Sequence, residues 1–325
     1  MANIVVTGSI AYDYLMSFPG RFSEVIMPDQ LEHISLSFLV DTMVKQRGGV
    51  APNIAYTLAL LGGHPTIMAT AGQDFAEYRQ WLESEGIDTS AIIEIPEVFT
   101  ASFFVNTDLD QNQIASFYTG AMAYADTLTF REFAPTTELA IISPNDPRAM
   151  QAYVRECKAL GIPYIYDPSQ QTIRLSGEEL YDGLNGCYLL AVNGYEFGLI
   201  QERTGLSETE IKDLAGGLLV TSGAKGSELI IEGGQWSIPA VPPAAIVEPT
   251  GAGDAFRAGL MRGYELDLPW PIAGRMGALA AAFVLENVGT QNHRFTPDDF
   301  VARYRQHFDD EGALDQLIEA SWTLS

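Results

Sequence analysis

The chain has 325 residues, of which 47% are hydrophobic and 18% charged, enough apolar material for one large or two smaller globular domains. Its 42 acidic and 18 basic residues give a formal net charge of −24, which would repel a nucleic acid or an anionic membrane. We therefore expect neither nucleic acid nor a membrane as a partner. A small anionic substrate would need backbone amides and helix N-termini to offset the negative charge of the protein at its site.

Apolar runs of β-rich composition alternate with helical patterns along most of the chain. The first, within MANIVVTGSI, has no basic region or cleavage site of a signal peptide, so we expect a first strand and a cytoplasmic protein. The alternation predicts an open, mainly parallel α/β sheet flanked by helices. The runs expected to be buried strands are residues 4–6, 66–69, 139–142, 164–166, 188–192 and 218–221.

Two stretches interrupt this alternation, and their segments SFFVNTD and QIASFYT have the composition of strands. We predict a small β-sheet lid built from residues 13–46 and 99–121. The large nucleotide-binding and catalytic α/β domain then comprises residues 1–12, 47–98 and 122–325. Because open α/β sheets bind ligands at the carboxyl ends of their strands, the lid should close over a cleft there. An exposed apolar β face around residues 34–40 predicts a homodimer that pairs lid against lid.

Some patterns carry structural information only. Cys157 and Cys187 are the only cysteines, and their apolar surroundings predict buried free thiols. The four histidines lack the spacing of a zinc site. A capping box from Ser207 to Glu210, and Thr296 before a proline, predict two helix starts.

The strongest local signal is VEPTGAGDAFRAG at residues 247–259, a glycine turn that opens into a helix of small apolar residues. Asp254 would lie in the first helical turn, where it could accept a proton from a hydroxyl nucleophile. Without further context, a Gly-x-Gly sequence beside a helix is weak evidence for a phosphate site, and an aspartate at that position is often only a helix cap. The backbone amides that would form an anion hole belong to Thr250, Gly251, Ala252 and Gly253.

Two other phosphate-binding motifs do not fit. Phe256 stands at the third glycine position of a dinucleotide-binding fingerprint, and that motif would come unusually late in the chain. The GAKG turn at residues 223–226 lacks the Gly-Lys-Ser/Thr ending of a Walker A loop.

The segments GGVAPNIA at residues 48–55 and EPTGAGDAFRAG at residues 248–259 resemble, in the same order, the two signatures of the PfkB carbohydrate and nucleoside kinases. This resemblance implies a ribokinase-like fold, ATP and Mg²⁺ as cofactors, and Asp254 as the general base. Asn193 and Glu196 resemble the family's Asn-x-x-Glu element, which implies that Glu196 acts on Mg²⁺, directly or through water. The residues that resemble its nucleotide-side turn are Thr221, Gly223, Lys225 and Gly226.

Longer runs, among them TGSIAYDYLMSFPGRFSE, RGGVAPNIA and DPSQQ, are similar to the adenosine kinases of the mycobacterial type over nearly the whole chain. The resemblance implies ATP-dependent phosphorylation of the ribose 5′-hydroxyl of adenosine to AMP, a step of purine salvage. By matching position, the residues that would hold the ribose are Asp13, Gly49 and Asn53. Ser9 and Ser37 would lie close to the bound nucleoside. The residues that would face the base are Phe103, Phe117 and Gln171.

Each of these residues also has a plainer reading. Asp13 could be a solvated turn acid or a helix cap, and Asn53 could merely cap a helix. Glu196 could be an exposed acid in a first helical turn, stabilised by the helix dipole, and the two phenylalanines could be lid core. The role of Arg257 stays open between a phosphate contact and the protein surface. Glu248 stands where many family members have an aspartate in a loop associated with a monovalent cation, so dependence on K⁺ also stays open.

Two rival functions remain at this stage. The first is a kinase for another nucleoside or for a sugar, such as inosine, guanosine, ribose or fructose; the scarcity of Arg and Lys in the N-terminal half argues against a phosphorylated sugar. The second is a nucleoside-binding protein without catalysis, which the intact Asp254 disfavours.

Overall fold

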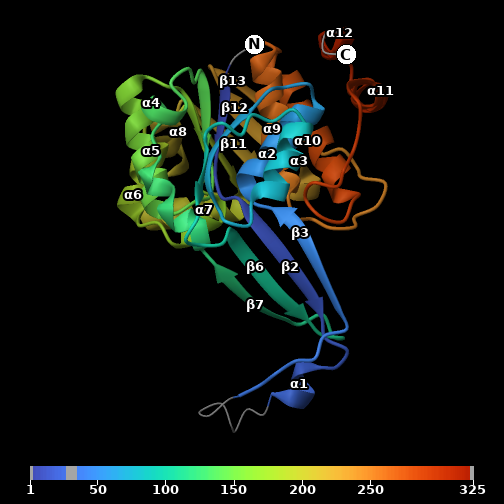
Figure 1. Cartoon of the computed structure of the whole chain (residues 1–325). Helices are drawn as coiled ribbons and strands as arrows, with labels where there is room; N and C mark the ends of the chain where they lie inside the picture. Colours follow the sequence, from blue (N-terminus) through green and yellow to red (C-terminus); the bar gives the residue numbers. More distant parts are fainter. Residues whose placement is uncertain (1–2, 27–34, 323–325) are drawn as a thin grey trace.

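The computed structural model describes residues 3–26 and 35–322, and Figure 1 shows an α/β body from which a small sheet projects at one end. The body is built on a nine-stranded sheet in the order β13-β12-β11-β10-β9-β8-β1-β4-β5. The seven strands from β11 to β5 run parallel, and β12 and β13 add antiparallel pairs at one edge. The predicted fold class is confirmed. The strands are β1 (Ile4–Thr7), β4 (Thr66–Gly72), β5 (Ile92–Ile95), β8 (Leu139–Ile142), β9 (Tyr164–Tyr166), β10 (Leu189–Asn193), β11 (Gly217–Thr221), β12 (Ser227–Ile231) and β13 (Gly234–Ile238).

Helices cover both faces of this sheet. Successive strand residues point to opposite faces, so Ile4 and Val6 enter one hydrophobic core while Val5 enters the other. The helices on the first face are α2 (Val50–Leu60), α3 (Ala76–Ser84), α9 (Ala252–Glu265), α10 (Trp270–Leu285), α11 (Pro297–His307) and α12 (Asp315–Trp322). Those on the second are α4 (Phe130–Phe133), α5 (Pro147–Leu160), α6 (Gly177–Leu184), α7 (Gly194–Thr204) and α8 (Glu208–Leu214).

The projecting sheet has four strands in the order β3-β2-β6-β7. Strand β2 pairs in parallel with β6, and the two outer pairs are antiparallel. Both interruptions of the α/β pattern thus supply strands outside the main sheet, as predicted. The elements of this region are β2 (Ala11–Ser17), the short helix α1 (Phe22–Val25), β3 (Thr42–Gly48), β6 (Ala101–Thr107) and β7 (Gln113–Tyr118).

The prediction of a β face around residues 34–40 was wrong for the part that the structure describes, because residues 35–40 form no strand. The Phe38 ring instead packs edge-on against Phe18 and Phe22, with ring centroids 5.1 and 5.0 Å away. Residue 34 lies outside the described residues.

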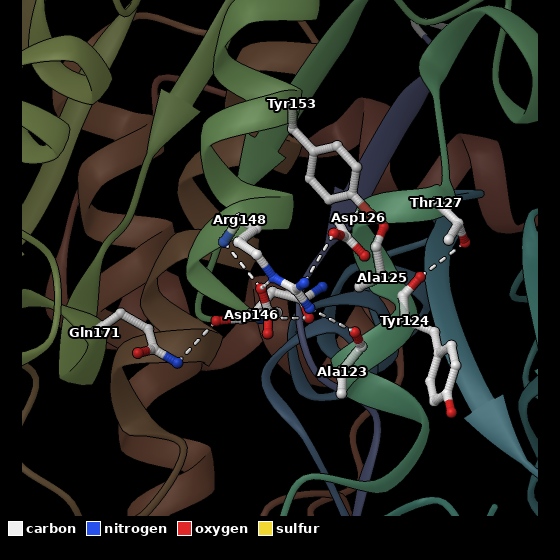
Figure 2. Close-up of polar contacts among 10 residues, drawn as sticks. Ala123, Tyr124, Ala125, Asp126, Thr127, Asp146, Arg148, Tyr153 and Gln171 are labelled. Atoms are coloured by element: carbon white, nitrogen blue, oxygen red, sulfur yellow. Dashed lines mark hydrogen bonds and ion pairs between the residues drawn. The ribbon is translucent and has the colours of Figure 1, made fainter.

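The chain returns from the small sheet to the body through the 3₁₀ helix η2 (Gly120–Thr127), and Arg148 fixes this return (Figure 2). Its guanidinium donates to the carbonyl oxygen of Ala123 at 3.0 Å and to Asp146 at 3.1 Å, and it forms an ion pair with Asp126 at 3.5 Å. The base of β7 is therefore anchored to the N-terminus of α5.

Several smaller predictions are confirmed. Ser207 and Glu210 form the expected capping box of α8, and Thr296 caps α11. Cys157 and Cys187 are buried and unpaired, and burial raises the pKa of both thiols to about 12. Within residues 3–26 and 35–322, no helix combines the length and the apolar character needed to cross a membrane.

Candidate active site

A cavity of about 620 Å³ lies between the small sheet, the carboxyl ends of the parallel strands and the N-terminus of α9. This is the edge of an open α/β sheet at which ligands are bound. The predicted residues that line it come from chain positions far apart: Ser9, Asp13, Gly49, Asn53, Phe103, Phe117, Asn193, Glu196, Thr221, Thr250, Gly251, Gly253 and Asp254.

The N-terminus of α9 forms one end of the cavity. Gly251 caps the helix with a φ of 81°, a left-handed conformation that glycine adopts without strain. A Cβ atom there would also approach the Thr290 side chain to 2.9 Å. Because the first amides of a helix have no intrahelical partner and carry its positive dipole, this turn can bind an anion.

Asp254 lies in the first turn of α9, and its Oδ2 accepts a hydrogen bond from Asn53 Nδ2 at 2.8 Å. Burial raises the pKa of Asp254 to about 6 and the Glu196 carboxylate adds to the rise, while Arg257 and the Asn53 hydrogen bond oppose it. A carboxylate with a pKa of about 6 is still ionised at neutral pH and is a stronger base than an exposed aspartate.

Arg257 is buried one turn further along α9, with 8% of its surface exposed, so it is not a surface residue. Its Nη2 donates to Asp167 Oδ1 at 2.6 Å, and the pair is shielded from solvent. Burial raises the pKa of Asp167, and the guanidinium opposes this rise. A Cβ atom on Gly253 would come within 2.7 Å of Arg257 Nη1, which places the guanidinium directly beside the glycine turn.

Three side chains from the small sheet form the opposite wall. Phe103 is the register partner of Asp13 on β2 and of Phe117 on β7, so all three lie on one face of the sheet. Phe117 is 49% exposed, although it is a large aromatic residue. Burial, with a smaller contribution from Glu248, raises the pKa of Asp13 to about 6.

The floor of the cavity depends on a close backbone approach at Gly49, which precedes α2. Gly49 has a φ of 98°, and a Cβ atom there would lie 2.5 Å from the carbonyl oxygen of Ser9. The Ser9 hydroxyl accepts a hydrogen bond from Val50 N at 3.4 Å. Any larger residue at position 49 would therefore displace the strand that carries Asp13.

The Asn-x-x-Glu element is a reciprocal capping box at the start of α7. Asn193 Oδ1 accepts from Glu196 N at 2.9 Å, and Glu196 Oε2 accepts from Asn193 N at 2.8 Å. Both residues also line the cavity. The alternative of an exposed first-turn acid is thus wrong, because Glu196 is buried in this capping box and its carboxylate lies at the site.

Some predicted positions do not line the cavity. Gln171 is buried and its Nε2 donates to the carbonyl oxygen of Asn145 at 2.8 Å (Figure 2), while Ser169 and Gln170 line the cavity beside it. Ser37 is exposed on the segment without a strand. The other predicted residues outside the lining are Ala252 on α9, Gly223 and Lys225 in the exposed turn after Thr221, and the buried Gly226 that ends this turn.

Sequence reasoning missed Asp167, Thr290 and Gln291. Asp167 directly follows β9 in the DPSQQ segment, and an acid at the carboxyl end of a strand was the available signal. Gln291 Nε2 donates to Asn53 Oδ1 at 2.7 Å across 238 positions of sequence. No local pattern reveals a partner at that separation.

Similarity to known proteins extends over most of the chain that forms this site. The family described as pfkB family carbohydrate kinase matches residues 1–297. The chain belongs to this family. The nucleoside kinase of Methanothermobacter thermautotrophicus is 29% identical over 305 residues, covering 93% of this chain and 95% of that protein.

Solved structures agree with this assignment. The nucleoside kinase of Burkholderia thailandensis in complex with inosine superimposes with a TM-score of 0.84 at 35% identity, covering 94% of this chain and 98% of that one. A ribokinase from Thermotoga maritima, at 20% identity and a TM-score of 0.78, covers 94% of this chain and 100% of its own, and shows the ribokinase-like fold alone. These relatives support the PfkB family; the narrower likeness to mycobacterial adenosine kinases stays a prediction.

Proposed function

We propose that this chain is an ATP-dependent nucleoside kinase that transfers the γ-phosphoryl group to the ribose 5′-hydroxyl of a purine nucleoside, with adenosine as the preferred acceptor in a step of purine salvage. The observation that carries the proposal is the position of Asp254. It lies at a helix N-terminus suited to phosphate, in the same cavity as Asp13 and the Phe103–Phe117 pair.

The reaction is a direct in-line transfer. Asp254 accepts the proton of the 5′-hydroxyl as the new oxygen–phosphorus bond forms and the bond from the γ-phosphorus to the β–γ bridging oxygen breaks, leaving ADP. The backbone amides of Thr250, Gly251 and Gly253, which line the cavity, stabilise the equatorial oxygens of the phosphoryl group. The amide of Ala252 instead donates to the carbonyl oxygen of Pro249 at 3.4 Å. Arg257 adds positive charge beside the same turn, and Asp167 holds it there.

The donor set suits Mg²⁺ bound together with phosphates. Among the residues that the structure describes, no group of three His, Cys, Asp or Glu side chains could cage a metal. Mg²⁺ commonly uses one or two carboxylates, several waters and the substrate phosphates, and Glu196 supplies one such carboxylate in the cavity. When bound, the ion would neutralise charge on the phosphates of ATP.

Base recognition supports a nucleoside rather than a free sugar. Phe103 and Phe117 present two aromatic side chains on the face that also carries Asp13, and a sugar kinase has no need of aromatic surface beyond C1′ of the ribose. Inosine is the second candidate acceptor, because a relative covering nearly the whole chain has been solved with inosine.

We further propose that the small sheet acts as a lid and as the interface of a homodimer. Large apolar residues are exposed on and beside it, with Leu39 85% and Met43 63% exposed. An exposed apolar surface of this kind favours association with another protein surface, here the small sheet of a second copy of the chain.

A panel of acceptors tests the proposed function. Phosphorylation from ATP should proceed with a higher kcat/KM for adenosine and inosine than for ribose or fructose. Equal or better turnover of a free sugar would make the chain a sugar kinase. Nucleoside binding without any turnover would make it a binding protein.

A further inference from the structure

A second cavity, of about 250 Å³, lies at the base of the small sheet, away from Asp254. Tyr12 and Arg47 are register partners across β2 and β3, and their side chains lie on the face opposite to Asp13. The cavity is closed by α3 and by the segment that follows α10. Among its lining residues are Tyr12, Lys45, Arg47, Glu77, Tyr78 and Gln291.

The cavity holds two cations whose charges are not paired. Lys45 Nζ lies 3.6 Å from the centre of the Tyr12 ring, and the Arg47 guanidinium carbon lies 4.0 Å from the centre of the Trp81 ring. Within the described part of the chain, neither residue forms an ion pair, not even with Glu77 in the same lining. The aromatic faces stabilise the positive charges without using their hydrogen-bond donors.

One of these donors is left unsatisfied. Arg47 Nε is buried and has no hydrogen-bond partner among the described residues, a state that normally costs free energy and calls for an explanation. The concentration of unpaired positive charge is unexpected in a chain with a net charge of −24. Asp74 lies near Tyr12 but outside the lining, and its carboxylate accepts a hydrogen bond from Thr100 N at 2.8 Å. Glu77, the acid in the lining, can neutralise at most one of the two cations, so the cavity is suited to an anion.

A chain of hydrogen bonds joins this cavity to the catalytic aspartate. Tyr78 OH donates to Gln291 Oε1 at 2.8 Å, and Gln291 Nε2 donates to Asn53 Oδ1 at 2.7 Å. Asn53 Nδ2 then donates to Asp254 Oδ2 at 2.8 Å. Of the lining residues, Gln291 is therefore two hydrogen bonds away from the proposed general base, and Tyr78 is three.

We propose that the second cavity is an effector site for a small oxyanion, a ligand with phosphate or carboxylate groups, held by Lys45 and Arg47. The planar guanidinium of arginine binds such groups with two parallel hydrogen bonds. The volume is below that of usual sites for drug-sized ligands, so a whole nucleotide is disfavoured. The ligand would alter catalysis through Tyr78, Gln291 and Asn53, a consequence that rests on the proposed kinase function.

Binding can be measured without any assay of activity. Trp81 is one of four tryptophans, and its fluorescence should change when a ligand draws Arg47 away from its ring. We expect a saturable change when the protein is titrated with inorganic phosphate or, in a separate arm, with succinate, and none in Trp81→Phe. The arm that saturates at the lower concentration identifies the preferred anion.

Two variants assign the signal to this cavity. Lys45→Met keeps the aliphatic stem over Tyr12 and should weaken binding about 10- to 100-fold, the loss expected for a charged hydrogen bond. Arg47→Met should weaken binding by a similar factor, and an unchanged melting temperature would show that this variant is still folded. Lys212→Met is the matched control, because Lys212 pairs with Glu208 on the exposed surface of α8, and it should bind as the wild type does.

The absence of saturation with both anions would overturn the site. Binding by Lys45→Met and Arg47→Met with wild-type affinity would also overturn it, since the anion would then occupy the helix N-terminus near Asp254. The saturating anion should also change kcat for adenosine in the wild type but not in Lys45→Met. Binding without any change in kcat would overturn the coupling to Asp254 and leave the kinase proposal standing.

Discussion

Phe117 is the residue that best separates a nucleoside kinase from a sugar kinase. A base stacked on an aromatic side chain contributes about 1–3 kcal/mol, judged from single-strand binding proteins. Phe117→Ala should therefore raise KM for adenosine roughly 5- to 150-fold, with a smaller effect on kcat, because stacking is nearly uniform between ground and transition states. The same variant should leave KM for ribose nearly unchanged. An equal loss with both substrates would make the two phenylalanines structural residues of the lid.

The protonation of Asp254 should appear in the pH dependence of the reaction. Because its pKa is raised to about 6 and the base must be ionised to accept a proton, kcat/KM should fall as the pH is lowered through about 6. Arg257 lowers this pKa, so Arg257→Met should move the fall to higher pH. If kcat/KM of Arg257→Met falls at the same pH as that of the wild type, the titrating group is not Asp254. Arg155→Met is the control, because Arg155 lies on the exposed side of α5, and its pH dependence should match that of the wild type.

Glu196 caps α7 together with Asn193, and it is also the carboxylate that we propose for Mg²⁺. Glutamine can replace glutamate in a capping box, so Glu196→Gln should keep the melting temperature of the wild type. It removes the carboxylate proposed for Mg²⁺, and the Mg²⁺ concentration needed for half-maximal activity should rise at least about tenfold. Glu196→Ala removes both the cap and the carboxylate, so it should lower the melting temperature and also raise the required Mg²⁺ concentration. If Glu196→Gln and wild type require the same Mg²⁺ concentration, the residue is only a cap.

The elements were predictable from the sequence where local chemistry determines them. Apolar runs placed six strands of the nine-stranded sheet but not β5, β12 or β13, and the glycine turn placed Asp254 in the first turn of α9. The prediction failed at Gln171, because η3 (Ser169–Ile173) is a 3₁₀ helix in which each step turns the side chain by about 120°. Gln170 consequently faces the cavity instead. The partners of Asn53 and Arg257 were hidden because they are distant in sequence.

At the scale of the whole molecule, the exposed apolar surface of the projecting sheet predicts self-association. Leu39 and Met43 are among its most exposed apolar side chains. Light scattering at micromolar concentration should give the mass of a dimer, and Met43→Lys should shift it toward the monomer. The matched change Leu160→Lys, at an exposed apolar residue at the C-terminal end of α5 in the body, should leave the dimer intact. A wild-type monomer under these conditions would contradict lid pairing.

The account as a whole depends on Asp254 as the general base of phosphoryl transfer to a nucleoside. The most direct measurement is the steady-state kinetics of Asp254→Asn with adenosine and ATP. The amide keeps the shape and removes the base, so kcat should fall by about 10²–10⁴ while the affinity for adenosine, measured by direct binding, stays close to that of the wild type. A loss of less than about tenfold in kcat, well under that range, would contradict the central claim.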